Sequence, residues 1–276
     1  MKEFNTTAVC IPSKHYMVDL TKRVAEIRKL VDAGKYFTIN RGRQYGKTTT
    51  LNELRKVLTA QYEVISLDFQ GLGNASFQTE EDFCRGFGRL ILDKQELGLV
   101  FLPETVLEGL RRFVTDGSDN TKLQDLMRIM RLWCKLSEKP VVLMIDEVDS
   151  ATNNQVFLDF LAQLRDGYIS RDTEGVPAFL SVILAGVTDV KHLKSKIRPE
   201  DSHKQNSPWN IAADFDIDMS LSKDGICSML DEYESDHHTG MDIEKIAWTI
   251  RDYTAGYPFL VSRICQLLDE KVSKSL

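Results

Sequence analysis

The residues of this chain that are best suited to chemistry are Gly46, Lys47 and Thr48, which stand between a short apolar run and a helix-like segment. A glycine lets the backbone approach an anion closely, because it has no Cβ atom. A lysine ammonium and the unpaired N–H groups of a helix N-terminus both attract negative charge. A threonine hydroxyl beside them is an oxygen ligand for Mg²⁺. This order of residues is typical of a loop that binds a phosphate chain and its metal ion.

The loop departs from the usual pattern G-x-x-x-x-G-K-[ST], because Arg41 stands where that pattern has its first glycine. Gly42, which comes next in the chain, would supply the turn instead. The alternative is an ordinary strand–helix turn with solvated basic residues. On the first interpretation, the nucleotide-binding residues are Gly42, Arg43, Gln44, Tyr45, Gly46, Lys47, Thr48 and Thr49.

A second set of candidate residues, Asp146 and Glu147, follows the apolar run 141–145, as in the Walker B pattern. The Asp146 carboxylate would hold Mg²⁺ together with Thr48. Glu147 would polarise the water that attacks a γ-phosphate. An Asp-Glu pair at a strand end can also cap a following helix. Its combination with Gly-Lys-Thr at a strand–helix junction favours the nucleotide-binding interpretation.

Alternating strand and helix patterns must position these residues. Apolar runs predict strands at 36–40, 62–68, 141–145 and 178–185. Apolar spacing of three and four predicts helices at 20–33, from about 49 after the loop, and at 79–97, 104–115, 122–136 and 153–169. This alternation indicates an α/β fold, a three-layer sandwich with a mostly parallel sheet. Ligands of such sheets bind beyond the carboxyl ends of the strands, where Asp68 and Thr188–Asp189 also stand.

The C-terminal part of the chain is predicted to be helical, with helices at 222–234, 242–253 and 258–273. Pro258 suits the first turn of the last helix. We therefore expect a core with an N-terminal lead-in at 1–216 and a helical lid at 217–276. In the lead-in, Tyr16 and Met17 belong to a polar-aromatic cluster that would contact a nucleotide base, or else pack onto the core.

The composition is that of an ordinary soluble globular protein, with 276 residues, 42% hydrophobic and 28% charged. A net charge of -6 argues against a general binder of nucleic-acid backbones. The cysteines lie far apart, which is typical of reduced thiols rather than of disulfides or a zinc site. The sequence has neither a signal-peptide pattern nor an apolar run long enough to span a bilayer, so we expect a cytoplasmic protein without membrane contact.

Four segments together resemble the bacterial AAA-ATPase-like family of P-loop ATPases, which is related to archaeal-type and STAND ATPases: 41–49, 145–149, 185–189 and 256–260. Members of that family replace the first loop glycine, typically with R-P-R-x-F-G-K-[ST], so the resemblance implies that Arg41 is a family trait. It also implies an additional-strand sheet, in which the strand before Thr188 lies between the loop strand and the Asp146 strand. The lid would face the nucleotide at Gly256-Tyr257-Pro258.

The resemblance further implies roles for residues outside the two main motifs. Thr188 or Asp189 takes the sensor position at the γ-phosphate. Arg198 is the preferred phosphate-sensing or trans-acting arginine, and a solvated loop charge is the alternative. Arg263, in the last predicted helix, is a second candidate, with a surface arginine as its alternative.

We therefore expect an Mg²⁺-dependent ATPase that binds ATP and ADP and whose lid moves during turnover. Its catalytic residues would be Glu147, Thr188 and Arg198, and its metal ligands Thr48 and Asp146. The alternative is a slow or non-hydrolysing switch that recruits a protein or nucleic-acid partner. Self-association or a protein partner is expected, whereas nucleic-acid binding rests on family analogy alone and is unsupported by the charge.

Overall fold

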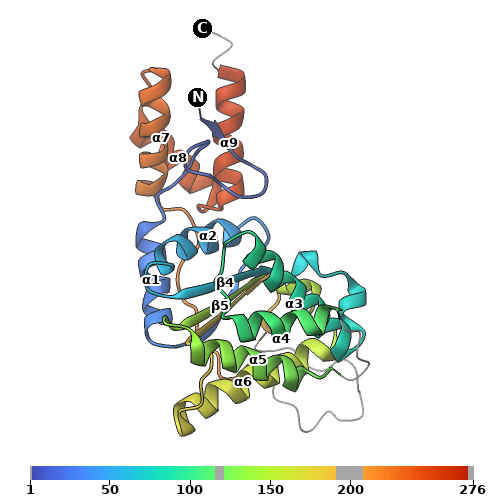
Figure 1. Cartoon of the computed structure of the whole chain (residues 1–276). Coiled ribbons are helices and arrows are strands. Elements are labelled where there is room, and N and C mark those ends of the chain that lie inside the picture. The colour runs from blue at the N-terminus through green and yellow to red at the C-terminus, as the bar shows by residue number, and fades with distance from the viewer. Residues whose placement is uncertain (1, 116–120, 191–207, 273–276) are drawn as a thin grey trace, which may run out of the picture. The chain divides into compact units, whose positions relative to one another are not determined.

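The computed structural model describes residues 2–115, 121–190 and 208–272 (Figure 1). The chain forms two compact units, which are described separately. The sheet unit comprises Arg28–Asn40 and Arg55–Phe215, and the helical unit comprises Met1–Ile27, Arg41–Leu54 and Asp216–Leu276. The division into domains at residue 216 stays a prediction.

The sheet unit contains four parallel strands among the described residues: β3 (Tyr36–Asn40), β4 (Glu63–Asp68), β5 (Val141–Asp146) and β6 (Ser181–Gly186). Their order is β3-β6-β5-β4, which confirms the predicted parallel α/β sheet with β6 between the loop strand and the Asp146 strand. Asn40 pairs with Gly186, and Asp68 pairs with Asp146. The carboxyl ends of all four strands therefore meet at one edge. Figure 1 shows β4 and β5 side by side.

Every residue of β5 and β6 is buried, as expected for parallel strands covered on both faces. Val141, Leu143 and Ile145 belong to the main core cluster of the sheet unit. Val142 and Met144 alternate with them, are equally buried, and point to the opposite face of the sheet.

Three helices of the sheet unit match the predicted positions closely: α3 (Glu80–Glu96), α4 (Glu104–Thr115) and α5 (Leu123–Leu136). Helix α6 (Gln155–Glu174) continues past its predicted end at 169. Helices α3, α4 and α5 lie next to one another (Figure 1). Three short 3-10 helices follow strand ends or precede α3: η1 (Phe69–Gly71), η2 (Asn74–Phe77) and η3 (Val148–Ser150). Phenylalanine rings join η1, η2, α3 and α6 into one aromatic cluster, with Phe69 in contact with Phe77, Phe83, Phe87 and Phe157.

The helical unit contains α7 (Lys223–His237), α8 (Ile243–Thr254) and α9 (Pro258–Val272). Helices α1 (Thr21–Asp32) and α2 (Lys47–Leu58) begin in this unit and continue into the other. The lead-in, predicted to be merely extended, forms a parallel pair of short strands, β1 (Glu3–Phe4) and β2 (His15–Tyr16). Phe4 and Tyr16 pack against Tyr233 of α7, so the lead-in is part of the core of this unit.

The turn before α9 requires a glycine. Gly256 has a φ of +73°, and a Cβ atom there would lie 2.3 Å from the carbonyl oxygen of Leu221. The two backbones are joined by a hydrogen bond of 2.8 Å from Leu221 N to Gly256 O. This contact fixes the start of α9 against the segment that leads into α7.

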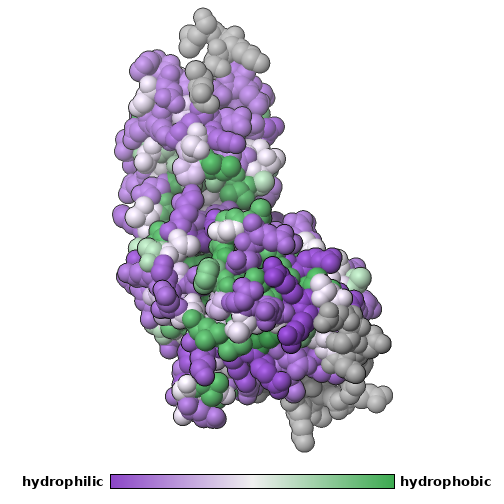
Figure 2. Space-filling model, in the orientation of Figure 1, coloured by the Kyte–Doolittle hydropathy of each residue, from purple (hydrophilic) through white to green (hydrophobic). Residues whose placement is uncertain are grey.

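Hydrophilic side chains cover most of the face seen in Figure 2, with smaller hydrophobic patches between them. None of the helices in the described part of the chain has the length and apolar character needed to cross a membrane. All five cysteines are free thiols, and Cys84, Cys227 and Cys265 are buried.

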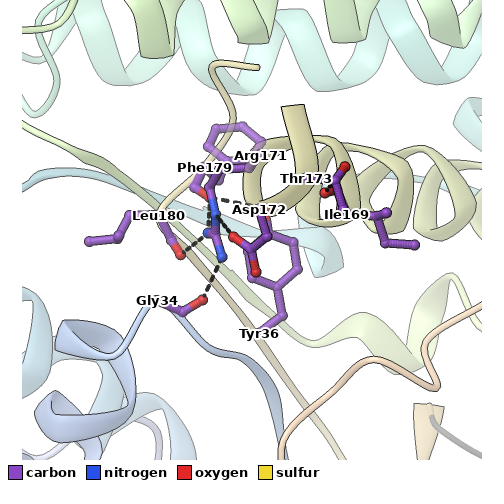
Figure 3. A network of polar contacts seen from close by, with 8 residues as sticks. All are labelled: Gly34, Tyr36, Ile169, Arg171, Asp172, Thr173, Phe179 and Leu180. Carbon is purple, nitrogen blue, oxygen red and sulfur yellow. Dashed lines mark hydrogen bonds and ion pairs between the residues drawn. The ribbon is translucent and has the colours of Figure 1, made fainter. Parts of the chain in front are cut away.

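Arg171, near the end of α6, fastens the starting ends of β3 and β6 (Figure 3). Its guanidinium donates hydrogen bonds to the carbonyl oxygens of Phe179 (2.9 Å), Leu180 (2.6 Å) and Gly34 (3.1 Å). It also lies over the rings of Tyr36 and Tyr168, at 5.7 and 4.8 Å from their centroids. A planar guanidinium can do both at once, whereas a lysine ammonium cannot.

We expect Arg171→Met to lower the free energy of unfolding by about 3–6 kcal/mol, because the carbonyl oxygens of Leu180 and Gly34 each lose a hydrogen bond of about 1.5–3 kcal/mol to a charged donor, while Phe179 O keeps its bond from the Tyr36 hydroxyl. Chemical denaturation measures this change. Arg128→Met is the matched control, since the Arg128 side chain is 82% exposed and pairs with Asp125 on the same helix. Equal stability of the two variants would contradict the role of Arg171.

Candidate functional site

The predicted phosphate loop leaves the end of β3 at Asn40 and enters α2 at Lys47. Two of its residues are left-handed, Gln44 with a φ of 59° and Gly46 with a φ of 73°. Helix α2 begins two residues earlier than the apolar pattern predicted, so Lys47, Thr48 and Thr49 form its first turn. The N–H groups of a first turn have no acceptor within their own helix. The backbone therefore has the form of an anion-binding loop at a helix N-terminus.

The Lys47 side chain is folded back over this loop. Lys47 is only 7% exposed, and its Nζ donates to the carbonyl oxygens of Arg41 and Gly42, each at 3.0 Å. A buried ammonium needs such partners, because desolvation disfavours its charge. The two carbonyl oxygens therefore hold the ammonium against the loop backbone.

Two segments that precede the C-terminal helices contact the loop. The Tyr257 hydroxyl, one residue before α9, donates to the carbonyl oxygen of Arg43 at 2.8 Å. The Tyr257 ring packs on Tyr45, with 4.9 Å between ring centroids. Arg41 donates to the carbonyl oxygen of Ile217 at 3.1 Å. The loop conformation thus depends on the Gly256-Tyr257-Pro258 segment, which the resemblance had placed at the nucleotide without giving Tyr257 a role.

A pocket opens beside the loop within the helical unit. Thr49 contributes to it, and the Thr49 hydroxyl accepts a hydrogen bond from Cys10 N at 3.2 Å. Burial raises the pKa of the Cys10 thiol, so this group is a neutral part of the wall. The pocket is lined by Cys10, Tyr16, Met17, Val18, Leu20, Arg23, Gly46, Thr49, Leu221, Met229, Pro258 and Ser262.

Tyr16 faces this pocket and also packs in the core, so the two alternatives for the polar-aromatic lead-in cluster are compatible. Its hydroxyl donates to Asp236 Oδ2 at 2.7 Å. Burial and this hydrogen bond raise the pKa of Tyr16. The aromatic side chain is therefore a fixed, neutral surface.

In the sheet unit, Asp146 and Glu147 lie at the carboxyl end of β5, as predicted. Asp146 is 7% exposed, and one of its oxygens accepts a hydrogen bond from Glu147 N at 2.9 Å. Glu147 is left-handed, with a φ of 54° and a ψ of 41°. A residue with a Cβ atom in this region costs of order 1–3 kcal/mol, and such strain is concentrated at functional sites. Asp68, at the end of β4, instead caps η1 by accepting from Gln70 N.

Thr188 follows the neighbouring strand β6 and lies on the same edge of the sheet as Glu147. Its backbone N–H is held by Asp149, which also accepts from Val187 N. Neither Asp149 nor Tyr257 was predicted as a site residue. The signals for them were the acidic residue within Asp146-Glu147-Val148-Asp149 and the aromatic residue inside the Gly-x-Pro segment.

Of the two arginines predicted to act at the phosphates, the structure describes Arg263 but not Arg198. Arg198 lies outside the described residues, so its role stays a prediction. Arg263 is exposed on α9 and donates to Gln266 Oε1 of the same helix at 2.7 Å. The surface alternative therefore fits Arg263 better than a phosphate contact.

The oxygen atoms of the predicted metal ligands are of the kind that Mg²⁺ prefers. Within the described ranges, no three His, Cys, Asp or Glu side chains are grouped so that they could hold a metal ion. Mg²⁺ usually takes one or two protein oxygens and completes its shell with water and substrate phosphates. The Thr48 hydroxyl and the Asp146 carboxylate are oxygen donors of that kind.

Among curated proteins, the WD repeat-containing protein slr0143 of Synechocystis sp. is 25% identical over 256 residues, which are 90% of this chain and 20% of that protein. The chain thus spans about a fifth of the length of this relative.

Among solved structures, Cdc6p from Pyrobaculum aerophilum aligns with a TM-score of 0.47 and 13% identity, over 84% of this chain and 52% of that chain. The Orc1 protein of Aeropyrum pernix, solved in complex with DNA, aligns with a TM-score of 0.49 and 8% identity, over 94% of this chain and 62% of that chain. Both similarities are remote, and neither identifies a partner for this chain.

The family comparison covers almost the whole chain. The sequence pattern of the AAA-like domain family matches residues 4–274, a range that contains the loop, the carboxylate pair and the C-terminal helices. This chain therefore belongs to the AAA-like domain family of ATPase-type, nucleotide-binding domains.

Proposed function

We propose that this protein is an Mg²⁺-dependent ATPase that hydrolyses ATP to ADP and phosphate and uses turnover to drive or gate a conformational change. The sheet order supports the proposal most strongly. The strand that runs into the loop and the strand that ends in Asp146-Glu147 flank β6, with all three parallel. Because parallel strands present their carboxyl ends at one edge, this order supports the two motifs acting on one ligand.

Each predicted site residue receives a chemical role in this proposal. The loop N–H groups from Gly42 to Thr49 would bind the phosphates, and Lys47 would exchange its two carbonyl partners for phosphate oxygens. Thr48 and Asp146 would hold Mg²⁺, which when bound neutralises charge on the β- and γ-phosphates. Glu147 would polarise the attacking water, and Thr188 would contact the γ-phosphate. Arg198 stays a candidate for the arginine that acts at the transition state.

The pocket beside the loop is the proposed place of the base. Tyr16, Met17 and Pro258 offer it largely apolar surface next to Gly46 and Thr49. Since these residues lie in the lead-in and at the start of α9, a bound nucleotide would contact both. Through these contacts, occupancy of the site would reach the helices α7 to α9.

A second candidate function is a nucleotide-gated switch that hydrolyses slowly and recruits a partner. The relative slr0143 favours it, because the similar segment there is a fifth of a WD repeat-containing protein. A domain of this kind can control a neighbouring module, whether that module is on the same chain or on a separate protein. Stimulation of ATP turnover by self-association or by a protein partner would distinguish the two candidates.

ATP binding and phosphate release in the presence of Mg²⁺ test the proposed function. We expect Lys47→Ala to weaken ATP binding roughly tenfold to hundredfold, because a hydrogen bond to a charged group contributes about 1.5–3 kcal/mol. Glu147→Gln should retain binding and lose about 10²–10⁴-fold in turnover, the usual contribution of a general base. Calorimetry and a phosphate-release assay give the two quantities.

Lys245→Ala is the control for the charge, because Lys245 is an exposed lysine near the start of α8 in the same unit. If the wild-type protein binds ATP but does not hydrolyse it, the switch is the correct function and the ATPase is not. Absence of binding in the wild type would contradict both candidates.

Because the backbone of Glu147 is left-handed, replacing Glu147 by glycine should raise the stability of the protein although it removes the activity. Glu147→Gly should be more stable than Glu147→Ala by about 1 kcal/mol, because only glycine adopts this φ without strain. Both variants should lack turnover. Ala255→Gly, at another left-handed residue with a φ of 49°, should gain similar stability and keep its turnover. Equal unfolding free energies of Glu147→Gly and Glu147→Ala would show that the backbone at residue 147 is not strained.

The contact of Tyr257 with the loop predicts graded losses of ATP affinity. Tyr257→Phe removes the hydrogen bond to Arg43 O and should weaken ATP binding roughly twofold to tenfold, as expected for about 0.5–1.5 kcal/mol. Tyr257→Ala also removes the ring from Tyr45 and should weaken binding further. Tyr253→Ala is the control, since Tyr253 is 81% exposed. Wild-type affinity in Tyr257→Ala would show that the loop needs no support from the segment before α9.

A further inference from the structure

The short turn η3 connects the end of β5 to the strand ends on both of its sides. On the β6 side, the Asp149 carboxylate accepts hydrogen bonds from Val187 N at 2.6 Å and Thr188 N at 2.7 Å. On the β4 side, Ser150 Oγ lies 3.2 Å from the carbonyl oxygen of Phe69. The two side chains reach residues that are far away in the sequence, so they are more than local turn contacts.

Each oxygen of the Asp149 carboxylate has its own donor. Asp149 Oδ2 faces Val187 N, and Oδ1 faces Thr188 N. Hydrogen bonds to a charged acceptor are short and roughly twice as strong as neutral ones. Together the two bonds fix both the position and the direction of the backbone at Thr188.

Gly186 provides the space for this carboxylate. A Cβ atom on Gly186 would lie 2.9 Å from Asp149 Oδ2 and 2.9 Å from Val148 Cγ2. Any larger residue would push η3 and the end of β6 apart. The glycine at the end of β6 and the acidic residue in η3 are therefore two parts of one contact.

Because Asp149 follows Glu147 so closely in the chain, the contact sets where Thr188 lies relative to Glu147. We propose that Asp149 is a positioning residue for hydrolysis, holding the Thr188 backbone beside the Asp146-Glu147 pair. This inference rests on the proposed ATPase function. It assigns Asp149 no contact with ATP, so turnover should depend on Asp149 while binding of ATP does not.

Asp149→Asn is the most direct variant, because a carboxamide has the same shape but only one acceptor oxygen, and its NH₂ group would face a second N–H donor. We expect its kcat to fall by about tenfold to hundredfold, the order of loss caused by a 1 Å misplacement. The affinity for ATP should stay within about threefold, and unfolding should stay cooperative. Asp166→Asn is the matched control, because it makes the same change to a carboxylate on α6 that is 61% exposed and paired with Arg131, and it should keep kcat within about threefold.

Gly186→Ala tests the same contact from the other strand. It leaves Asp149 intact but separates it from Val187 and Thr188, so kcat should fall while ATP affinity is kept. Amide proton signals of Val187 and Thr188 provide a direct readout by NMR. Both should move upfield and exchange faster with solvent in either variant than in the wild type.

A double-mutant cycle shows whether Asp149 acts through Thr188. In a Thr188→Ala background, Asp149→Asn should lower kcat by no more than about threefold, because the positioned group is already gone. A full, multiplicative loss in that background would overturn the proposal. Wild-type kcat in Asp149→Asn, or a loss of ATP binding together with folding, would also overturn it. Wild-type protein that binds ATP without hydrolysing it would overturn the proposed function and this inference together.

Discussion

The parallel pairing of β6 with β3 on one side and β5 on the other is the constraint on which the sheet unit depends. Parallel strands need long connections, and here those connections are the helices that supply the buried cluster around Phe69 and Phe83. Arg171 fastens the starting ends of β3 and β6, and Asp149 fastens the finishing end of β6 to η3. Strand β6 is therefore held at both ends, and this restrains the backbone of Thr188, which follows it.

Residues of the helical unit stabilise the predicted phosphate loop, which has unusual backbone torsions and a buried ammonium. The left-handed backbone of Gln44 would be costly without support, whereas Gly46 adopts its positive φ without strain. Three hydrogen bonds give this support. The Tyr257 hydroxyl donates to Arg43 O, the Arg41 guanidinium donates to Ile217 O, and the Lys47 ammonium donates to the loop carbonyl of Arg41. Because Gly256 fixes the start of α9 against Leu221, the loop and the C-terminal helices form a single packed arrangement within this unit.

Most elements could be predicted from the sequence, since long apolar runs such as 141–145 and regular helical spacing such as 104–115 leave few alternatives. The ends of the elements were harder to predict. Helix α6 continues to Glu174, where Gly175 caps it, although its last turns carry little apolar pattern. The strand pair β1–β2 is too short to give a period. Contacts such as Asp149 with Thr188, or Tyr257 with Arg43, join distant segments through backbone groups, and no sequence pattern encodes a backbone partner.

We propose that the loop and the carboxylate pair bind one magnesium nucleotide, and a crystal structure with Mg²⁺ and a non-hydrolysable ATP analogue is the first experiment to do. We expect phosphates on the N–H groups between Gly42 and Thr49, with Lys47 moved from the loop carbonyls to a phosphate oxygen. We also expect a metal ion at about 2.0–2.1 Å from Thr48 Oγ1, with the Asp146 carboxylate bound to the ion or to one of its waters. A nucleotide bound elsewhere, or a metal ion without Thr48 and Asp146 around it, would show that the two motifs do not act on one ligand.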